Sequence, residues 1–368
     1  MKHLLAFLST LLIFSFISAQ QFEIYVSDAG NFNEPPWQIL KFDQDGSNGE
    51  VFTTDELAWP QDIVFIEDQG VVLISNLNTN RINRHDAATG EFIDIFASGI
   101  GGPTRMKVGS DGLLYVLQWS GNGLVKRYDL NGNFVDDFTD AAVLQSIGLD
   151  WDSNGDLYVS SFSGGSVRKF NQSGEDQGIF FAANALGPTN IWFNDVGELL
   201  VCDWNGSTVK RFDSDGQYID EFISGLSQSE GVDIFPNGNI LIGNGGTSAV
   251  KLFSNDGTFI EDIILSGTLG LIRPNAAILR EMPVSMHEIA QDKFEVFPNI
   301  GTQFKLQISN MGQVNSIEVF NELGQIVHKM DTNNSLIWNA EGVQNGHFFI
   351  RVLFKDGTFE EKSVLVEG

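Results

Sequence analysis

The chain has 368 residues, of which 42% are hydrophobic and 39 are glycine, so it is long enough for one large and one small β domain. Its formal net charge of −27 at pH 7 argues against nucleic acid and an anionic membrane surface as partners. The single cysteine, Cys202, excludes an intrachain disulfide, and its place in an apolar run favours a small buried side chain over a reactive thiol.

The N-terminus has the pattern of a secretory signal peptide. A short polar start precedes an almost wholly apolar run of fourteen residues, Leu4–Ile17, whereas a membrane-spanning helix needs about 20. Small residues follow, and cleavage after Ala19 or Gln20 is expected. We therefore predict a signal peptide at residues 1–19. No other apolar stretch approaches membrane length, so we expect no transmembrane segment in the mature chain.

Residues 188–226 show the repeating unit of the chain. Short apolar runs at Ile191–Phe193, Leu199–Cys202 and Val209–Phe212, and a weaker one at Tyr218–Phe222, are separated by Asp, Asn and Gly residues. Apolar runs of this length bounded by turn residues are typical of four strands joined by hairpins.

Turn glycines repeat in two registers at one period. The first register has successive spacings of 42, 43, 42 and 41 residues and contains Gly70, Gly112, Gly155, Gly197 and Gly238. The second register contains Gly90, Gly132, Gly174, Gly216 and Gly257. A period in the low forties with four strands per unit indicates a β-propeller.

The two ends of the repeat region determine the number of blades. Phe22–Thr53 contains only the later strands of a unit, and the segment from Pro274 contains only a first strand. Five whole units and these two fragments predict an all-β fold with a six-bladed propeller over residues 22–281. Pairing of the C-terminal strand with the N-terminal strands would close the ring and remove an open sheet edge.

One face of this propeller is predicted to bind a ligand. The second strands end in register on polar residues, namely Asp28, Asn76, Gln118, Ser161, Asp203 and Asn244. Aromatic residues follow several of them, and inner-strand starts add acids and amides. Aromatic plates beside carboxylates and amides suit a glycan, peptide or protein ligand. The candidate residues are Trp37, Asp62, Arg105, Trp119, Phe162, Asn190, Asp203, Trp204, Glu230 and Asn275. The alternative is that these side chains only fill the gaps between blades.

The repeats resemble the NHL-repeat and gluconolactonase-like six-bladed propellers. The resemblance rests on P-x-x-I near the blade starts, on G-D-L-Y-V-S at Gly155–Ser160 and on V-K-R-F-D-S-D-G at Val209–Gly216. It covers roughly residues 22–281. It implies the fold, and for the lactonase-like members it implies a divalent cation such as calcium in the central channel, held by Glu, Asn and Asp on inner strands.

The ligand set for such a cation is incomplete in this sequence. Glu230 stands at a suitable inner-strand start, but Ile147 stands where the family has Asn, and Gln61 and Thr104 are weak substitutes. Hard cations prefer several oxygen ligands that include carboxylates. The only propeller histidine, His85, is expected in a solvated outer turn. We therefore expect ligand binding without a cofactor, and we keep a metal-dependent lactonase or hydrolase as the alternative.

A second unit follows the repeats. Residues 282–293 are polar and unpatterned and are predicted to be a linker. Short alternating runs at 304–308, 316–320, 325–329 and 347–354, separated by turn residues, predict a small antiparallel, immunoglobulin-like β-sandwich over 294–368.

This second unit resembles the C-terminal sorting domain of the type IX secretion system of Bacteroidetes. The resemblance rests on F-P-N at 297–299, on I-E-V-F-N-E-L-G-Q-I-V, on L-I-W-N-A-E-G-V-Q-N-G-H-F-F-I-R-V and on the final K-S-V-L-V. It departs from the family at Ile300, where a second proline is usual. It implies export by the type IX machinery to the medium or the outer-membrane surface. The alternative is an accessory sandwich.

Overall fold

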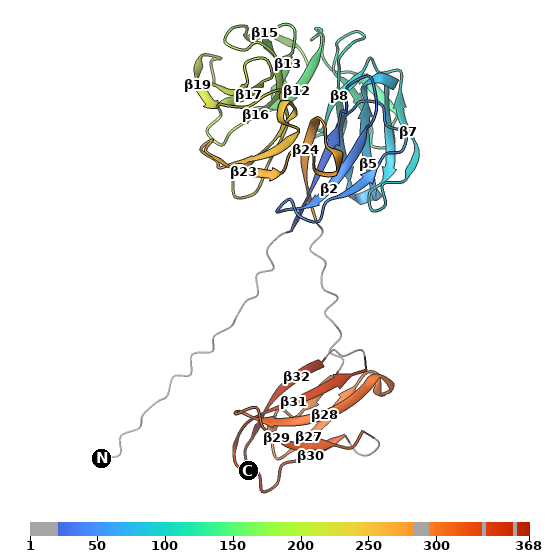
Figure 1. The fold of residues 1–368 in the computed structure, drawn as a ribbon, viewed down its shortest axis with the longest axis vertical. Coiled ribbons are helices and arrows are strands. Elements are labelled where there is room, and N and C mark those ends of the chain that lie inside the picture. The colour runs from blue at the N-terminus through green and yellow to red at the C-terminus, as the bar shows by residue number, and fades with distance from the viewer. Residues whose placement is uncertain (1–20, 283–293, 333–335, 356–358) are drawn as a thin grey trace, which may run out of the picture. The chain divides into compact units, whose positions relative to one another are not determined.

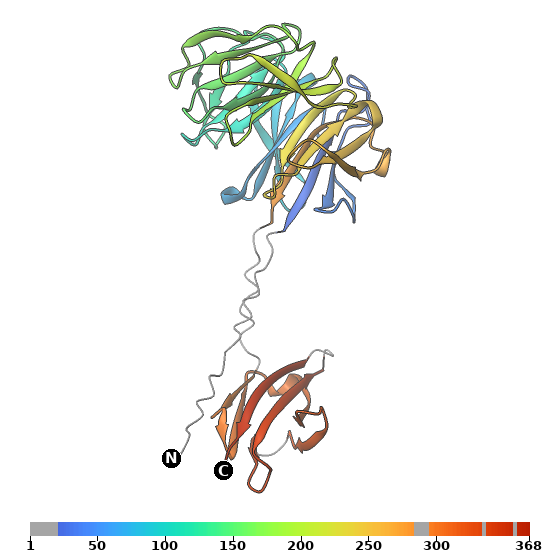
Figure 2. The same ribbon diagram turned by 90° about the vertical axis from the view of Figure 1, so that its left-hand side faces the viewer.

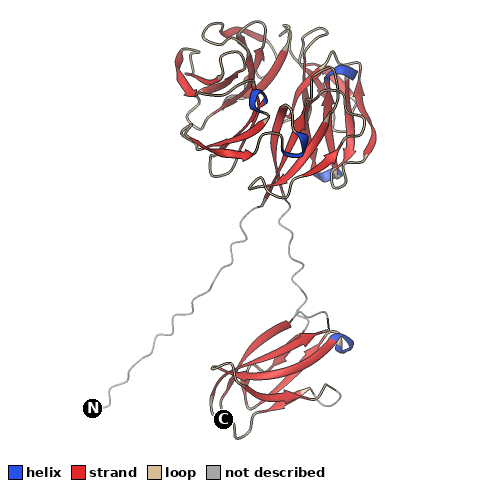
Figure 3. Cartoon of the chain, in the orientation of Figure 1, coloured by secondary structure: helices blue, strands red, loops and turns tan. Residues whose placement is uncertain are grey.

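The computed structural model describes residues 21–282, 294–332, 336–355 and 359–368 (Figure 1). The predicted signal peptide lies outside these residues, as does nearly all of the predicted linker. The chain divides into two compact units at Met282 and Pro283. Strands dominate both units, and the helical segments are short 3-10 turns (Figure 3). Within the described ranges, no helix has the length and apolar character needed to cross a membrane.

The first unit confirms the predicted propeller. It consists of six four-stranded antiparallel sheets, which we number as blades 1 to 6. Blade 1 contains β24 (Pro274–Glu281), β1 (Phe22–Asp28), β2 (Gln38–Asp43) and β3 (Glu50–Thr53), blade 2 contains β4 (Pro60–Ile66), β5 (Val71–Asn76), β6 (Arg81–Asp86) and β7 (Phe92–Ser98), and blade 3 contains β8 (Pro103–Val108), β9 (Leu114–Gln118), β10 (Lys126–Tyr128) and β11 (Phe134–Asp137). Blade 4 contains β12 (Ser146–Trp151), β13 (Leu157–Ser161), β14 (Ser166–Phe170) and β15 (Asp176–Phe181), blade 5 contains β16 (Pro188–Phe193), β17 (Leu199–Asp203), β18 (Thr208–Phe212) and β19 (Tyr218–Ile223), and blade 6 contains β20 (Ser229–Ile234), β21 (Ile240–Asn244), β22 (Ala249–Phe253) and β23 (Phe259–Ile264).

The ring closes through strands from the two ends of the repeat region. β24 pairs with β1 antiparallel, as the incomplete end units predicted. The register runs from Phe22 opposite Glu281 to Asp28 opposite Pro274. In Figure 1 the orange β24 accordingly lies beside the blue strands of blade 1. The pairing gives β1 a partner on each edge, so β1 is not left as an open edge strand.

The first strands of the blades surround the central channel. β4, β8, β12, β16, β20 and β24 contact one another in sequence around the ring. The hydrophobic core lies between neighbouring blades rather than in one central mass. Leu73 and Ile82 of blade 2, for example, belong to the same buried cluster as Met106 and Val116 of blade 3. Figure 2 shows the propeller turned by 90°, with the green and yellow strands of its later blades toward the viewer.

The second register of turn glycines also has an inter-blade role. Gly216 has a φ of 76°, in the left-handed region that favours glycine. A Cβ at this position would overlap the carbonyl oxygen of Phe180 on the outer strand of the preceding blade. Gly46, Gly90, Gly132, Gly174 and Gly257 meet the preceding outer strand in the same way. Two requirements, a positive φ and close approach to the preceding blade, therefore explain why this register keeps its period.

The second unit is a small β-sandwich. One sheet has the order β25 (Phe294–Phe297), β27 (Gln303–Ile308), β30 (Ile337–Asn339), and the other has β26 (Ile300–Gly301), β32 (Phe359–Val366), β31 (Gly346–Phe354), β28 (Val314–Asn321), β29 (Ile326–Met330). Both sheets contribute to one core, in which Trp338 stacks on Phe304 with ring centroids 5.3 Å apart. The predicted small β-sandwich is confirmed, and its strands pair antiparallel except for the short β26, which pairs parallel to β32. The sorting role of this unit stays a prediction.

Candidate ligand-binding site

The six polar residues that end the second strands of the blades hold loops in place. Except for Ser161, they are 2% exposed or less. Their side chains bind the backbone of the loop that enters the inner strand: Asp28 accepts from Ile272 and Arg273, Asn76 from Ala58, Gln118 from Gly101, Asp203 from Leu186 and Gly187, and Asn244 from Ser227, while Ser161 donates to the Leu144 carbonyl. Buried backbone N–H groups need acceptors, and these residues supply them. The expectation that this ring faces a ligand is therefore corrected.

Two of the predicted site residues, Asp203 and Trp37, make contacts within the propeller itself. Asp203 has no exposed surface, and its carboxylate also pairs with Lys210 at 3.0 Å. Trp37 packs against the buried cluster around Tyr25, and its indole N–H donates to the carbonyl of Phe32 at 3.0 Å. Asp203 therefore has no surface to offer a ligand, and Trp37, which is half-buried, lines neither of the two cavities described below.

Four other predicted residues, Trp119, Phe162, Trp204 and Glu230, come together in an apolar cavity of about 170 Å³ at one end of the channel. We call this cavity the aromatic pocket. Its walls and floor are Phe32, Trp59, Gln61, Leu77, Trp119, Ile147, Phe162, Trp204 and Glu230. The three predicted aromatic residues, Trp119, Phe162 and Trp204, each directly follow a second strand, as expected. They are half-buried and therefore keep part of their ring surface open.

The aromatic rings form a nearly continuous wall. Trp119 and Phe162 have centroids 5.6 Å apart, and Phe162 and Trp204 are 6.4 Å apart in an edge-to-face arrangement. Phe32 and Trp59 form a second pair at 4.8 Å. Sequence reasoning missed Trp59. It directly precedes an inner strand in the left-handed conformation, with a φ of 54°, which no hydrophobic period reveals. A comparison of the residues that directly precede each inner strand could have identified Trp59.

Glu230 of the aromatic pocket belongs to a buried network of charged side chains that also contains Arg105 and Asp62. Glu230, in the lining, is 5% exposed, and its Oε1 lies 3.3 Å from Nη2 of Arg105, itself 4% exposed. The Arg105 guanidinium also donates to the backbone carbonyls of Gln61 and Asn275, and it lies 3.9 Å from Asp62. One cation from β8 thus ties together β4, β20 and β24 across the channel.

Burial has the largest effect on the pKa values of the two carboxyl groups in this network. It raises the pKa of Glu230 to about 7, against the opposing effect of the Arg105 charge. Burial likewise raises the pKa of Asp62, and Arg105 again opposes the shift. A carboxyl group that titrates near neutrality at the floor of a pocket is a candidate functional group.

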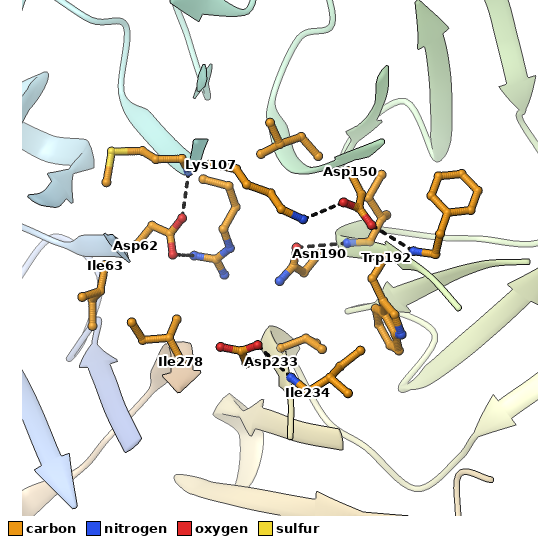
Figure 4. Close-up of a pocket in the computed structure, with 15 residues that line it drawn as sticks. Asp62, Ile63, Lys107, Asp150, Asn190, Trp192, Asp233, Ile234 and Ile278 are labelled. Carbon is orange, nitrogen blue, oxygen red and sulfur yellow. Dashed lines mark hydrogen bonds and ion pairs between the residues drawn. The ribbon is translucent and has the colours of Figure 1, made fainter. Parts of the chain in front are cut away.

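The other side of Arg105 opens into a larger cavity of about 340 Å³, which we call the polar mouth (Figure 4). Residues further along the inner strands line it, among them Asp62, Lys107, Asp150, Asn190 and Asp233. Three of these aspartates, on alternate blades, accept backbone N–H groups from the next inner strand: Asp62 from Met106 at 2.7 Å, Asp150 from Phe193 at 3.0 Å and Asp233 from Leu279 at 2.7 Å. Lys107 pairs with Asp150 at 2.6 Å. These carboxylates therefore join blades.

Of the four remaining predicted residues, three line the polar mouth and one lines neither cavity. Asp62, Arg105 and Asn190 line the polar mouth, not the aromatic pocket. Asn275 is 1% exposed and lies outside the lining of both cavities, although its carbonyl accepts from Arg105. The single face expected from the sequence is thus two cavities separated by Arg105, because successive inner-strand residues lie at different depths in the channel.

The donors in the channel do not fit a divalent cation. Among the described residues, no group of three or more His, Cys, Asp and Glu side chains has the geometry of a metal site. Glu230, the candidate metal ligand, already faces the Arg105 guanidinium. The same guanidinium donates hydrogen bonds to the backbone carbonyls of Gln61 and Asn275. His85 is fully buried on β6 with Nδ1 3.0 Å from the Gly90 carbonyl, so its expected solvated turn position was wrong.

No protein-family model matches the chain, and no curated protein matches it in sequence. Comparison with solved structures finds a propeller chain in the crystal structure of a nidogen/laminin complex, with a TM-score of 0.58, 12% identity, and coverage of 70% of this chain and 98% of that one. A protein of unknown function from Bacteroides caccae has a TM-score of 0.56 and 13% identity, covering 71% and 99%. A putative gluconolactonase has a TM-score of 0.49 and 16% identity, covering 57% and 79%. The chain therefore shares the six-bladed propeller fold with the first two structures.

Proposed function

We propose that the propeller is a binding module that recognises a protein or peptide by accepting one of its side chains in the aromatic pocket. The observation that carries this proposal is the cavity itself, in which five aromatic and two aliphatic side chains converge above a single carboxyl group. Concave, mostly apolar sites with few polar groups are the usual form of a binding site.

The size and lining of the pocket favour a side chain over a glycan. Its volume of about 170 Å³ is below the roughly 300–1,000 Å³ of sites that enclose a small molecule. Gln61 and Glu230 are the polar side chains of the lining, so most hydroxyl groups of a sugar would lose their hydrogen bonds to water there. One side chain of a larger ligand would fill the cavity, while the rest of that ligand lies over the surrounding loops.

The fold comparison supports a macromolecular partner. The structure with a TM-score of 0.58 is that of a complex between nidogen and laminin, two proteins. The alternative function, a metal-dependent lactonase, has weaker support because Arg105 occupies the carbonyl and carboxylate oxygens that a cation would need.

The aromatic wall provides the test of this function. Trp119→Ala and Trp204→Ala are each expected to weaken binding of peptides selected on a random peptide array about tenfold, since aromatic contacts contribute roughly 1–1.5 kcal/mol beyond burial. Phe259→Ala is the matched control, because Phe259 is an aromatic residue that is 52% exposed on an outer strand. Unchanged peptide binding by both tryptophan variants, or binding restricted to a glycan array, would contradict the proposal.

We also propose that residues 294–368 direct export through the type IX secretion system, so that the propeller acts at the cell surface or in the medium. The support is the sequence resemblance together with the separate core of this unit. Removal of residues 294–368 is expected to leave a folded propeller in the periplasm, with its melting temperature unchanged. Arrival of the truncated protein at the surface, measured by cell fractionation, would show that the sorting assignment is wrong.

A further inference from the structure

We propose that the side chain accepted by the aromatic pocket is cationic, an arginine or lysine in a basic segment of the protein ligand, with its charged group directed at Glu230. This inference rests on the proposed function and specifies the chemistry of the ligand.

The first support for this inference is the charge of the pocket lining. Glu230 is the single charged side chain among the nine residues of the lining, and at 5% exposed it is more deeply buried than the half-buried Trp119, Phe162 and Trp204. A cationic group of a ligand would pair with this carboxyl group in addition to Arg105, whereas an apolar ligand would not. The cost of desolvating an ionised carboxylate makes such pairing important in a closed site.

The walls suit the same ligand. The faces of aromatic rings carry negative electrostatic potential and attract ammonium and guanidinium groups, most strongly when water is excluded. Phe32, Trp59, Trp119, Phe162 and Trp204 supply five such rings. The methylene groups of a lysine or arginine side chain would pack on the same rings while the head group reaches the floor.

Two arginines, Arg105 and Arg273, act electrostatically on the carboxyl group of Glu230. Arg105 is shared between Glu230 and Asp62, at 3.3 Å and 3.9 Å. Arg273 covers one side of Phe32, with its guanidinium carbon 4.1 Å from the ring centroid, and donates to Gln228. It is not in the pocket lining. The formal charge of −27 on the whole chain adds a long-range attraction for a basic partner.

The protein uses this combination elsewhere in its own structure. The guanidinium of Arg280 lies 4.2 Å from the centroid of Phe65 and forms hydrogen bonds of 2.8 and 3.0 Å with the Glu67 carboxylate. Arg127 lies over Phe138 at 4.7 Å and pairs with Asp136 at 2.6 Å. The aromatic pocket offers the same two partners, rings and a carboxylate, to a cation supplied from outside.

The test compares charged and neutral side chains of nearly equal shape. Peptides Ac-Gly-Gly-X-Gly-Gly-NH2, with X as arginine, citrulline, lysine or norleucine, are titrated into the full-length protein and followed by tryptophan fluorescence and calorimetry. The arginine peptide is expected to bind at least tenfold more tightly than the citrulline peptide. Glu230→Gln should reduce this ratio to about twofold or less, and Glu261→Gln, which removes an exposed carboxylate on β23, should preserve it.

A pH series on the unaltered protein gives a second measurement that needs no variant. Because burial raises the pKa of Glu230 to about 7, the carboxyl group becomes protonated as the pH falls from 8 to 6. Asp62, whose pKa burial also raises, is not in the lining of the aromatic pocket and lies 3.9 Å from the Arg105 guanidinium. Binding of the arginine peptide should therefore weaken over this range, while that of the citrulline peptide should not change.

The outcomes separate the inference from the function on which it rests. If norleucine and citrulline peptides bind as tightly as arginine and lysine peptides, and Trp119→Ala weakens them all, the cationic specificity is wrong and the binding function stands. If none of the four peptides binds and the tryptophan variants leave array binding unchanged, both proposals fail.

Discussion

Replacement of Arg105 by methionine is expected to lower the free energy of unfolding of the propeller by about 3–5 kcal/mol, because it removes the partner of two buried carboxylates. Glu230 and Asp62 are 5% and 6% exposed, and both lie within 3.9 Å of the Arg105 guanidinium. The Gln61 and Asn275 carbonyls would also lose their donor. Chemical denaturation at pH 7.5, followed by fluorescence, measures the effect.

The pH dependence of this loss identifies its cause. Without Arg105 the folded-state pKa of Glu230, already raised by burial, would rise further above that of the unfolded chain. The folded state then holds a proton that the unfolded state releases, so stability falls as the pH rises through neutrality. The variant should therefore be less destabilised at pH 5 than at pH 7.5, and Glu230→Gln in the same chain should restore part of the loss. Equal destabilisation at both pH values would indicate lost packing instead.

Replacement of Asp28 by alanine is expected to cost at least about 3 kcal/mol, since a fully buried carboxylate with several charge-assisted hydrogen bonds is lost. Its oxygens accept from the N–H groups of Gly30, Ile272 and Arg273 at 2.8–3.0 Å and from Gln38 at 3.1 Å. Ile272 and Arg273 precede the closing strand β24, so these bonds tie the end of the ring to its beginning. Thermal unfolding of the full-length protein measures the change.

Asn76→Ala is the matched comparison for Asp28→Ala. Asn76 occupies the equivalent position in blade 2, is equally buried and accepts one loop N–H, that of Ala58 at 2.8 Å. Its loss should cost about 1–3 kcal/mol, the usual range for one unsatisfied buried group. Asp28→Ala should therefore be the more damaging change. Equal melting temperatures of the two variants would show that the ring closure does not depend on this carboxylate.

The candidate site could be predicted only in part. Trp119, Phe162 and Trp204 were found because they follow the second strands at the blade period, and that period places them around one opening. Trp59 and Ile147 were not recognised as pocket residues, because their inclusion depends on loop conformation and on depth along the channel. Asp203 was misplaced since a polar residue at a strand end looks the same in sequence whether it faces a ligand or the backbone of a loop.

The sequence by itself determined the architecture of the propeller. Four apolar runs per unit, glycines at a period in the low forties and two incomplete ends specify six blades and the pairing of β24 with β1, because strands, turns and open edges are governed by local composition and periodicity. Only the tertiary structure decided what the channel contains. Arg105 and Glu230 are 125 positions apart in the sequence. The Arg105 guanidinium donates hydrogen bonds to oxygen atoms on three other inner strands. Such contacts depend on the depth and direction of individual side chains after the ring has closed, and no local pattern encodes these properties.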